Sequence, residues 1–440
     1  MKHPRVRELV LLAGVCGVYA IGLLQLGTPA AVGFLGFTAV FAVLHIGVRA
    51  LAPRADPLLL PVVGLLVAVG LLELSAIDIA QEAEGVRGWQ PLARLQAAWL
   101  GVGAVAFLAT LYAFRNGLGR AWRVRYTLAL LGIAALLAPL LPGIGHTVNG
   151  ARLWLRFGPL SFQPAEIAKV LLVLFLAAYL SERRELLGQR TKRLFGPVYV
   201  IDPRYLAPLV GLVGLALLIF VQQNDLGSSL LFFATFMGIL WVATGRLFYP
   251  VTGLLLFAAG VYISLKTFSH VAVRFDTWLD PYADPDRAGF QLLQGQFAMA
   301  EGGIGGVGLV GEGAQPNLIP FAWTDFILAA IGHTFGLAGL LAVVMGFVVL
   351  LTRTFHIALR SGSDLHALAA SGFGIVTAVQ AGIIAGGVTW ILPLTGVTLP
   401  FISYGGSSLV SNFVMLGCLV AISNSETTTV APQRVEELVV

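Results

Sequence analysis

Long apolar runs, separated by short polar segments, make up most of this chain. A helix needs about 20 apolar residues to cross roughly 30 Å of hydrocarbon, and runs of that length recur from one end of the sequence to the other. We therefore predict an all-α polytopic membrane protein with about 12 transmembrane helices. These helices are expected near residues 9–26, 31–51, 59–79, 96–114, 124–141, 165–181, 205–222, 226–245, 247–266, 326–352, 365–388 and 405–424.

The composition agrees with this class of protein. The sequence is 58% hydrophobic and 11% charged, with a mean hydropathy of +0.87, whereas about 25% of the residues in ordinary soluble domains are charged. The formal net charge of +5 is spread over many loops and gives no indication of nucleic-acid binding. Cys16 and Cys418 both lie in apolar runs, so neither a disulfide framework nor a cysteine metal site is expected.

The placement of the positive charges predicts an orientation in the membrane. With a cytoplasmic N-terminus, 19 of the 27 Lys and Arg residues fall in the inside segments, 7 fall in the outside loops, and Lys169 lies within a span. Cytoplasmic loops carry the excess of Lys and Arg in membrane proteins. Both termini are therefore expected in the cytoplasm, and the helices are expected to contact membrane lipids.

Two predicted external segments are longer than a simple connection requires. They cover residues 146–164 and, between the ninth and tenth helices, about 267–325. Long loops in compact proteins are usually functional or disordered. The second loop contains Gly306, Gly308 and Gly311 in a GxGxxG pattern, but this pattern binds a pyrophosphate only between a strand and a helix of a βαβ unit. We interpret it as a tight or flexible turn.

Asp225 lies at the tip of the external turn between the seventh and eighth helices, in the stretch VQQNDLGSSLLFF. Aspartate is a preferred N-cap residue, and the apolar run that follows suits a helix. A carboxylate at the outer water boundary also suits a catalytic base. The two interpretations are compatible.

A second group of charges lies where the sixth helix begins. Pro164 suits the first turn of that helix, and Glu166 follows where the helix dipole favours a carboxylate. Lys169 is one turn further, so it is expected to pair with Glu166 on the same face. One interpretation is a local ion pair that makes a buried lysine tolerable. The other is that Lys169 and the nearby Arg152 form a cationic pocket for an anionic group such as a diphosphate, since ionisable groups inside spans are often functional.

Three further external patches carry polar groups. The patch at the start of the twelfth helix contains Gly405 and Gly406, which allow either close approach of a ligand to free amides or tight helix packing. The candidate binding residues of these patches are Arg274, Gln291 and Gln294 in the long loop, Thr324 and Asp325 before the tenth helix, and Ser403, Tyr404 and Ser407 at the twelfth.

Six segments, in this order along the chain, resemble signatures of the SEDS family (shape, elongation, division and sporulation), the RodA and FtsW type peptidoglycan glycosyltransferases. The segments are NGARLWLRFGPLSFQPAEIAK, NDLGSS, DPYADPDRAGFQLLQ, GGIGGVGL, TDF and TGVTLPFISYGGSSL. Family members commonly have ten spans. We accordingly expect N-terminal helices with extra spans in residues 1–141, a catalytic core with the loop 267–325 in residues 142–424, and a cytoplasmic tail in residues 425–440.

The resemblance implies polymerisation of lipid II into glycan strands on the outer face of the bacterial cytoplasmic membrane, for division or elongation, beside a class B penicillin-binding protein. It makes Asp225, the acid of the DLG motif, the catalytic residue, and a general base contributes about 10²- to 10⁴-fold. Lys169, Arg152 or Arg274 would stabilise the leaving undecaprenyl diphosphate. No resident cofactor or all-protein metal site is expected, although Mg²⁺ or Mn²⁺ could be shared with the diphosphate.

Three departures from the family pattern stand near these residues. Asn224 replaces a frequent proline before the DLG aspartate, and Trp323 replaces a histidine before TDF. Gly332, His333 and Thr334 stand where the family has the paired acids of a GEE pattern. They leave the proposed base in place and bear on activation by a partner, or on membership of the RodA or FtsW branch.

Two other functions are consistent with parts of the sequence. Twelve spans with the basic central loop SERRELLGQRTKR match a six-plus-six transporter or lipid flippase. Such proteins have repeated halves and charges near the bilayer midplane, whereas here most polar groups lie at one boundary. A non-catalytic scaffold for a penicillin-binding protein is the third hypothesis.

Overall fold

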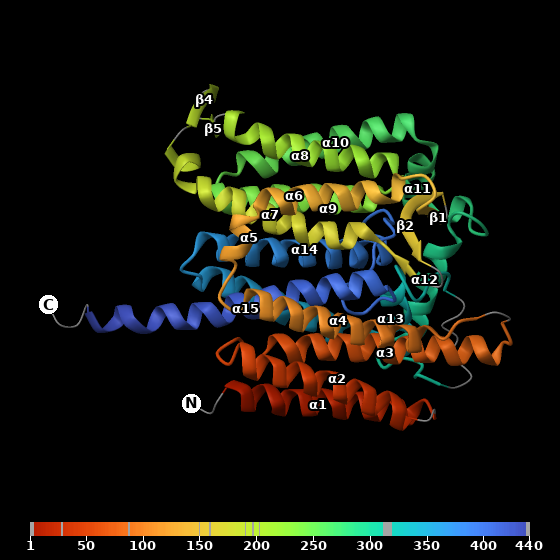
Figure 1. The fold of residues 1–440 in the computed structure, drawn as a ribbon. Coiled ribbons are helices and arrows are strands. Elements are labelled where there is room, and N and C mark those ends of the chain that lie inside the picture. Colours follow the sequence, from red (N-terminus) through yellow and green to blue (C-terminus); the bar gives the residue numbers. More distant parts are fainter. Residues whose placement is uncertain are drawn as a thin grey trace. The chain divides into compact units, whose positions relative to one another are not determined.

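The computed structural model describes residues 4–27, 30–86, 89–148, 150–157, 160–189, 191–195, 198–201, 203–310 and 319–436. Helices dominate these residues (Figure 1). Their bounds are α1 (Pro4–Gln25), α2 (Ala30–Leu51), α3 (Leu59–Ala83), α4 (Leu92–Phe114), α5 (Gly119–Arg123), α6 (Arg125–Leu137), α7 (Pro164–Gln189), α8 (Pro203–Gln222), α9 (Leu226–Thr244), α10 (Phe248–Thr267), α11 (Ser269–Leu279), α12 (Phe290–Gly302), α13 (Ile327–Arg360), α14 (Asp364–Val388) and α15 (Gly406–Glu436).

Every predicted apolar run is occupied by one of these helices. Ten helices of the described chain are long and apolar enough to cross a membrane. The two runs near 124–141 and 205–222 hold shorter apolar helical stretches, Arg125–Leu140 and Ala207–Gln222. The all-α membrane class is therefore confirmed, while the number of twelve spans stays a prediction. α15 continues to Glu436, beyond the predicted end of the last span near residue 424.

The chain divides into two compact units that interleave along the sequence. The first unit comprises Met1–Ala109, Val261–Arg353 and Gln380–Phe413, and the second comprises Thr110–Gly260, Thr354–Val379 and Val414–Val440. This division follows contacts between elements. The expected sequential parts, 1–141, 142–424 and 425–440, remain a prediction.

In the first unit, α3 is the central helix. Figure 1 shows α1, α2 and α3 side by side, and 78% of the most apolar stretch of α3 is buried. Gly70 lies so close to the backbone oxygen of Ile402 that a Cβ atom would be 2.4 Å from it. The apolar face of α3 is thus packed against the segment that precedes α15.

In the second unit, α7 is packed against α6 and α9, and α8 lies beside α9 (Figure 1). Leu136, Leu172 and Phe220 are among the buried side chains of its core. α14 also reaches this core, because a Cβ atom on Gly372 would touch Val173 and Ile239. Apolar packing of this kind fixes the start of α7 and α9, where predicted site residues lie.

Short strands occur in two connections. The segment after α6 forms an antiparallel sheet of β1 (Gly145–Val148), β2 (Ala151–Phe157) and β3 (Leu160–Phe162), and the basic loop holds the hairpin of β4 (Thr191–Phe195) and β5 (Val198–Ile201). The alternating sequence of β2, ARLWLRF, suits a strand because successive side chains point to opposite faces. These strands lie in connections and leave the helical class unchanged.

α13 is interrupted at Gly336, whose φ of 64° and ψ of −164° are not helical. The backbone of residues 303–308 is inserted at this break. Val307 and Gly308 donate amide hydrogen bonds to the carbonyls of His333 and Thr334, both at 3.0 Å. The carbonyl of Gly303 accepts from Leu337 at 2.9 Å, and that of Ile304 accepts from Ala338 at 3.1 Å. The insertion satisfies polar groups that a broken helix would otherwise leave bare in a low-dielectric interior.

The glycines of the GxGxxG pattern have a packing function in this insertion. A Cβ atom on Gly306 would lie 2.2 Å from the carbonyl oxygen of Thr334, so only glycine allows the two backbones to approach. Gly306 and Gly308 both have positive φ, whereas Gly311 lies outside the described residues. The interpretation as a tight turn is confirmed for the described part of the pattern.

Candidate active site

Asp225 caps the N-terminus of α9. One carboxylate oxygen accepts the backbone amide of Ser228 at 2.9 Å, and the other accepts its hydroxyl at 2.5 Å. The side chain is buried. The predicted helix cap is confirmed, and any catalytic role of Asp225 would have to coexist with these bonds.

The turn that carries Asp225 is tied to the sheet beside it. Asn224 has a φ of 58° and donates its amide to the carbonyl of Gly150 at 3.2 Å, while the backbone amide of Arg152 donates to Gln223 at 3.2 Å. Asparagine tolerates positive φ, but a proline, whose ring holds φ near −65°, could not adopt this backbone. The departure from the family proline at this position therefore has a conformational reason.

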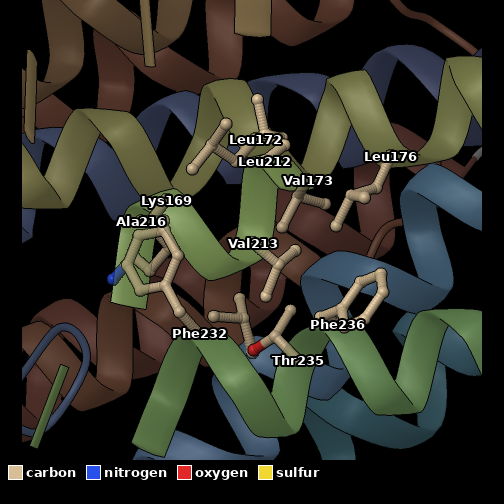
Figure 2. Close-up of a pocket in the computed structure, with 11 residues that line it drawn as sticks. Lys169, Leu172, Val173, Leu176, Leu212, Val213, Ala216, Phe232, Thr235 and Phe236 are labelled. Carbon is tan, nitrogen blue, oxygen red and sulfur yellow. The ribbon is translucent and has the colours of Figure 1, made fainter. Parts of the chain in front are cut away.

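Glu166 and Lys169 form the expected ion pair at the start of α7. Their charged atoms are 2.7 Å apart, and only 2% of the Lys169 side chain is exposed. Lys169 lines a small cavity of about 20 Å³ between α7, α8, α9 and α14 (Figure 2). Thr235 is the other polar residue of the lining, and the remaining lining side chains are Leu, Val, Ala and Phe. This cavity therefore places an ammonium group beside apolar walls.

Arg152 has a different position in the second unit. It lies on β2, and its guanidinium donates a hydrogen bond to the carbonyl of Leu141 at 3.0 Å. It is not among the described residues that line the cavity of Lys169. A shared cationic pocket of Arg152 and Lys169 stays a prediction.

Asp325, in the first unit, lies directly before α13. The hydroxyl of Thr324 donates to its carboxylate at 2.8 Å. Burial raises the pKa of Asp325 above its ordinary value, while the Thr324 hydrogen bond and the positive charge of Arg274 act in the opposite direction. Arg274 is an exposed residue of α11. A carboxylate with a raised pKa is a stronger base, and this makes Asp325 a candidate for proton transfer.

The segment before α15 holds the backbone next to Asp325. Ser403 donates its hydroxyl to the carbonyl of Thr324 at 2.6 Å and accepts the amide of Leu399 at 2.8 Å. The amide of Tyr404 donates to the carbonyl of Trp323 at 2.8 Å. The Ser403 hydroxyl is thus used within the protein, where it fixes the position of Thr324.

The expectation that Gly405 and Gly406 leave amides free for an anion is wrong for Gly405. Its amide donates to the side-chain oxygen of Gln96 at 3.2 Å, because Gln96 of α4 projects into this turn and also donates to the carbonyl of Ser403 at 3.0 Å. A Cβ atom on Gly406 would lie 2.2 Å from the indole of Trp99. The alternative interpretation, tight helix packing, is confirmed for Gly406.

The other predicted binding residues of the first unit have less defined roles. Gln291 of α12 donates to the carbonyl of Pro320 at 3.3 Å, and Gln294 is half-buried on the same helix. Ser407 is buried. Tyr404 is half-buried, and burial together with the negative charge of Asp78 raises its pKa.

Sequence reasoning missed two polar residues of this region, Gln96 and Asp78. Gln96 bonds the backbone of Ser403 and Gly405. Asp78 of α3 accepts hydrogen bonds from the indole of Trp89 at 2.9 Å and from the amides of Leu92 and Ala93 at 2.8 and 2.9 Å. It therefore caps the start of α4 from a neighbouring helix. Each is a polar residue inside an apolar run, and that signal could have singled them out.

A resident metal site has no counterpart in the described residues, which contain no group of three or more His, Cys, Asp or Glu placed to hold an ion. A divalent cation shared with the diphosphate stays a prediction.

A family model described as cell cycle protein, for the FtsW, RodA and SpoVE proteins, matches residues 56–428. The chain belongs to this family. Its members include a peptidoglycan glycosyltransferase RodA of Mycobacterium tuberculosis, which is 41% identical over 391 residues, covering 89% of this chain and 82% of the relative. A probable peptidoglycan glycosyltransferase FtsW of a Geobacter species is 33% identical over 289 residues, covering 66% and 75%.

A solved structure has the same fold. A chain from a peptidoglycan synthase complex, whose structure concerns the coordination of polymerisation and crosslinking, superposes with a TM-score of 0.65 at 27% identity, covering 84% of this chain and 97% of its own. The SEDS resemblance and the multi-pass membrane architecture are thus confirmed. The family match begins at residue 56, after α1 and α2.

Proposed function

We propose that this protein polymerises lipid II into glycan strands on the outer face of the bacterial cytoplasmic membrane. The observation that carries the proposal is family membership over residues 56–428, with relatives named as peptidoglycan glycosyltransferases. In this reaction a sugar hydroxyl attacks the anomeric carbon of a second lipid-linked sugar. Its proton goes to a base, and undecaprenyl diphosphate leaves.

Asp225 and Asp325 are the two candidates for the general base. Asp225 is the acid that the family resemblance singles out, and its carboxylate also caps α9. Burial raises the pKa of Asp325, and a base is most effective when its pKa approaches the working pH. Catalysis by either acid stays a prediction.

Positive charge for the leaving diphosphate is assigned to Lys169, Arg152 and Arg274. Lys169 has the strongest support, because it is a buried cation in the first turns of α7 with apolar side chains beside it. Arg274 is close enough to influence the charge of Asp325. Mg²⁺ or Mn²⁺, if used, would neutralise charge on the diphosphate and share its oxygens.

The proposed cellular role is that of RodA, in elongation. The RodA relative is 41% identical over 89% of this chain, whereas the FtsW relative is 33% identical over 66%. A class B penicillin-binding protein is the proposed partner, since the similar solved chain belongs to a complex that both polymerises and crosslinks. The excess of Lys and Arg in the alternate loops supports cytoplasmic termini and an external active site.

The test is polymerisation of purified lipid II by the detergent-solubilised protein, alone and with its cognate penicillin-binding protein. Wild type, Asp225→Asn and Asp325→Asn are compared, because asparagine keeps the shape of each side chain and can still cap α9. We expect long glycan chains from wild type and a loss of about 100-fold or more in the variant that lacks the base.

The larger loss in Asp225→Asn would assign the base to Asp225, and the larger loss in Asp325→Asn would assign it to Asp325. Equal polymer from all three proteins would exclude both acids as the base. No polymer from folded wild type with its partner would contradict the proposed function, and transbilayer movement of lipid II in vesicles would then favour a flippase. Partner binding without either activity would favour a scaffold.

A further inference from the structure

The short connection between α4 and α6, which is predicted to face the cytoplasm, is rich in arginine. It carries Arg115, Arg120, Arg123 and Arg125, while the sequence from residue 85 to residue 165 contains no Asp or Glu. An excess of arginine is general in cytoplasmic loops. The contacts of these arginines are particular to this connection, and they indicate a ligand.

The backbone of the connection is fixed within the second unit. The amide of Leu118 donates a hydrogen bond to the ring of His366, in the first turn of α14, at 3.0 Å. The helix α5 contacts both α6 and α7 (Figure 1). Its Ala121 is buried, whereas Trp122 and Arg123 are exposed. The exposed side of α5 is therefore presented from a well-anchored segment.

Arg125 is fixed at the start of α6 by two rings and an acid. Its guanidinium carbon lies 5.1 Å from the centre of the Trp122 ring and 4.9 Å from that of Tyr126. The guanidinium donates to Glu182 of α7 at 3.0 Å and to the carbonyl of Trp122 at 3.1 Å. Only 15% of the Arg125 side chain is exposed. An arginine held in this way loses little conformational entropy when it binds a ligand.

Arg183 of α7 is held in a similar way. Its guanidinium carbon lies 3.8 Å from the centre of the Tyr179 ring, and it donates to Glu182 at 2.9 Å. The Tyr126 hydroxyl interacts with the guanidinium groups of Arg183 and Arg125. One carboxylate thus serves two arginines, and positive charge remains in excess. Each guanidinium has five N–H donors in a planar fork that matches a phosphate group, and the bonds above use only part of them.

We call this group of side chains the basic–aromatic cluster. It contains four arginines and a single acid, and its members are Arg120, Trp122, Arg123, Arg125, Tyr126, Tyr179, Glu182 and Arg183.

An exposed apolar strip begins beside the cluster. Helical spacing places Tyr126, Leu130 and Leu137 on one face of α6, and all three are exposed. The helical stretch Arg125–Leu140 spans roughly 25 Å, whereas the hydrocarbon of a bilayer is about 30 Å thick. Such a short helix is accommodated by local thinning and by flanking side chains that reach the interface. The cluster is therefore expected at the depth of the phospholipid headgroups.

We infer that the basic–aromatic cluster binds the headgroup phosphate of an anionic phospholipid of the cytoplasmic leaflet, with an acyl chain along the exposed face of α6. Basic groups near the membrane surface attract anionic lipids, and Trp and Tyr rings are suited to the same depth. The apolar strip favours a lipid over a soluble phosphate. Arg183 lies about 20 Å along α7 from Lys169, so this site is separate from the proposed diphosphate site.

The first experiment measures lipid binding to the delipidated full-length protein in detergent by native mass spectrometry. The probes are dioleoyl phosphatidylglycerol, dioleoyl phosphatidylcholine with the same chains, and glycerol 3-phosphate, which has a phosphate without chains. We expect phosphatidylglycerol to bind at least about 10-fold more tightly than phosphatidylcholine, and its binding to weaken as the ionic strength rises. Glycerol 3-phosphate should not bind at the same concentrations.

The second experiment compares two double variants that remove the same charge. Arg120→Gln with Arg123→Gln alters the cluster. Arg49→Gln with Arg360→Gln is the matched control, because both arginines are exposed in the last turns of α2 and α13, at ends predicted to be cytoplasmic. We expect the cluster variant to lose about 10- to 30-fold in affinity for phosphatidylglycerol, and the control to stay within about twofold of wild type.

The single variant Arg125→Gln should also lose affinity, because it removes the guanidinium that the rings hold in place. Where it fails to fold, the exposed pair still decides. Equal affinity for phosphatidylglycerol and phosphatidylcholine would overturn the inference, as would no loss in the cluster variant or an equal loss in the control. Glycerol 3-phosphate binding as tightly as phosphatidylglycerol would show a site for soluble phosphate and would overturn the role of the lipid.

Discussion

Asp225 and Asp325 show that two aspartates near the ends of helices can differ in what their carboxylates do. Asp225 accepts from both the amide and the hydroxyl of Ser228, so its main visible function is to begin α9. Asp325 accepts from Thr324 and is half-buried, and this burial raises its pKa. The first arrangement stabilises the fold, whereas the second opposes folding when the carboxyl group is ionised.

This contrast predicts how Asp325→Asn will affect stability. Because the folded pKa of Asp325 lies above its unfolded value, the folded state binds more protons between the two pKa values, and stability falls as the pH rises through that window. At pH 7 the ionised group therefore opposes folding. Asp325→Asn should therefore unfold at the same temperature as wild type or at a higher one.

Thermal unfolding at pH 5 and pH 8 in the same detergent measures this effect. A lower unfolding temperature for Asp325→Asn at pH 8 would contradict it. If Asp325 is the base, the wild-type enzyme should also lose kcat/KM on the acid side with an apparent pKa above the ordinary aspartate value of about 3.9, because protonation removes the base.

Residues with local partners could be predicted from the sequence, and those with distant partners could not. The cap of Asp225 and the pair of Glu166 and Lys169 involve groups three positions apart, so spacing alone was sufficient. Gln96 bonds Ser403 across 307 positions, and Glu73 bonds Thr334 across 261. Such pairs depend on how helices pack, and a hydrophobic pattern does not specify them.

At the scale of elements, the ion pair in the first turns of α7 predicts an asymmetry between its two members. Lys169 is buried beside an apolar cavity. Glu166→Gln should lower the free energy of unfolding by roughly 3 kcal/mol or more, since it removes compensation from a buried charge. Lys169→Met should be much milder, because methionine suits the apolar walls.

Denaturant or thermal unfolding of the two variants decides this prediction, and polymerisation by Lys169→Met adds information on substrate binding. Equal destabilisation by both changes would show that the cavity does not accept an apolar side chain. A fully active Lys169→Met would remove Lys169 from the proposed diphosphate site.

The break in α13 gives a second prediction for an element. Gly336 has a φ of 64°, and a Cβ atom there would lie 2.4 Å from the amide nitrogen of Gly306 and 2.5 Å from the carbonyl oxygen of Ile304. Gly336→Ala should cost about 3 kcal/mol or more. Gly382→Ala in α14, where the Cβ atom would meet nothing within 4 Å, is the matched control and should be neutral or slightly stabilising.

Unfolding of Gly336→Ala and Gly382→Ala under the same conditions tests this prediction, and equal stability would contradict it. The break itself could not be read from the sequence. The predicted span near 326–352 is apolar on both sides of Gly336. Hydropathy therefore predicts where the helix lies but does not indicate that residues 303–308 are inserted into it. The strands after α6 were missed because membrane spans are predicted from the length of apolar runs, whereas strands are predicted from the alternation of residue types.

For the whole molecule, the distribution of Lys and Arg predicts which loops face which side of the membrane. Arg120 and Asp286 are both exposed. Arg120 lies in a connection predicted to be cytoplasmic, and Asp286 lies in one predicted to be external. In intact cells, Asp286→Cys should react with a membrane-impermeant maleimide, and Arg120→Cys should react only after permeabilisation. Wild type is the control, since Cys418 is buried and Cys16 is half-buried. Labelling of Arg120→Cys in intact cells would reverse the orientation.

The wide spacing of Glu73 and Thr334 has a consequence for how the protein is made. Asp78 finds its partners within 15 residues, so α3 and α4 acquire their polar contacts soon after they leave the ribosome. Glu73 must wait for 261 further residues, which takes roughly 13–50 s at bacterial rates of synthesis. During that time the inserted helix carries an acid without its native partner. A nascent chain that stops before residue 334 therefore keeps the Glu73 carboxyl group in the membrane without the Thr334 hydroxyl. This exposed acid would distinguish unfinished chains from finished ones.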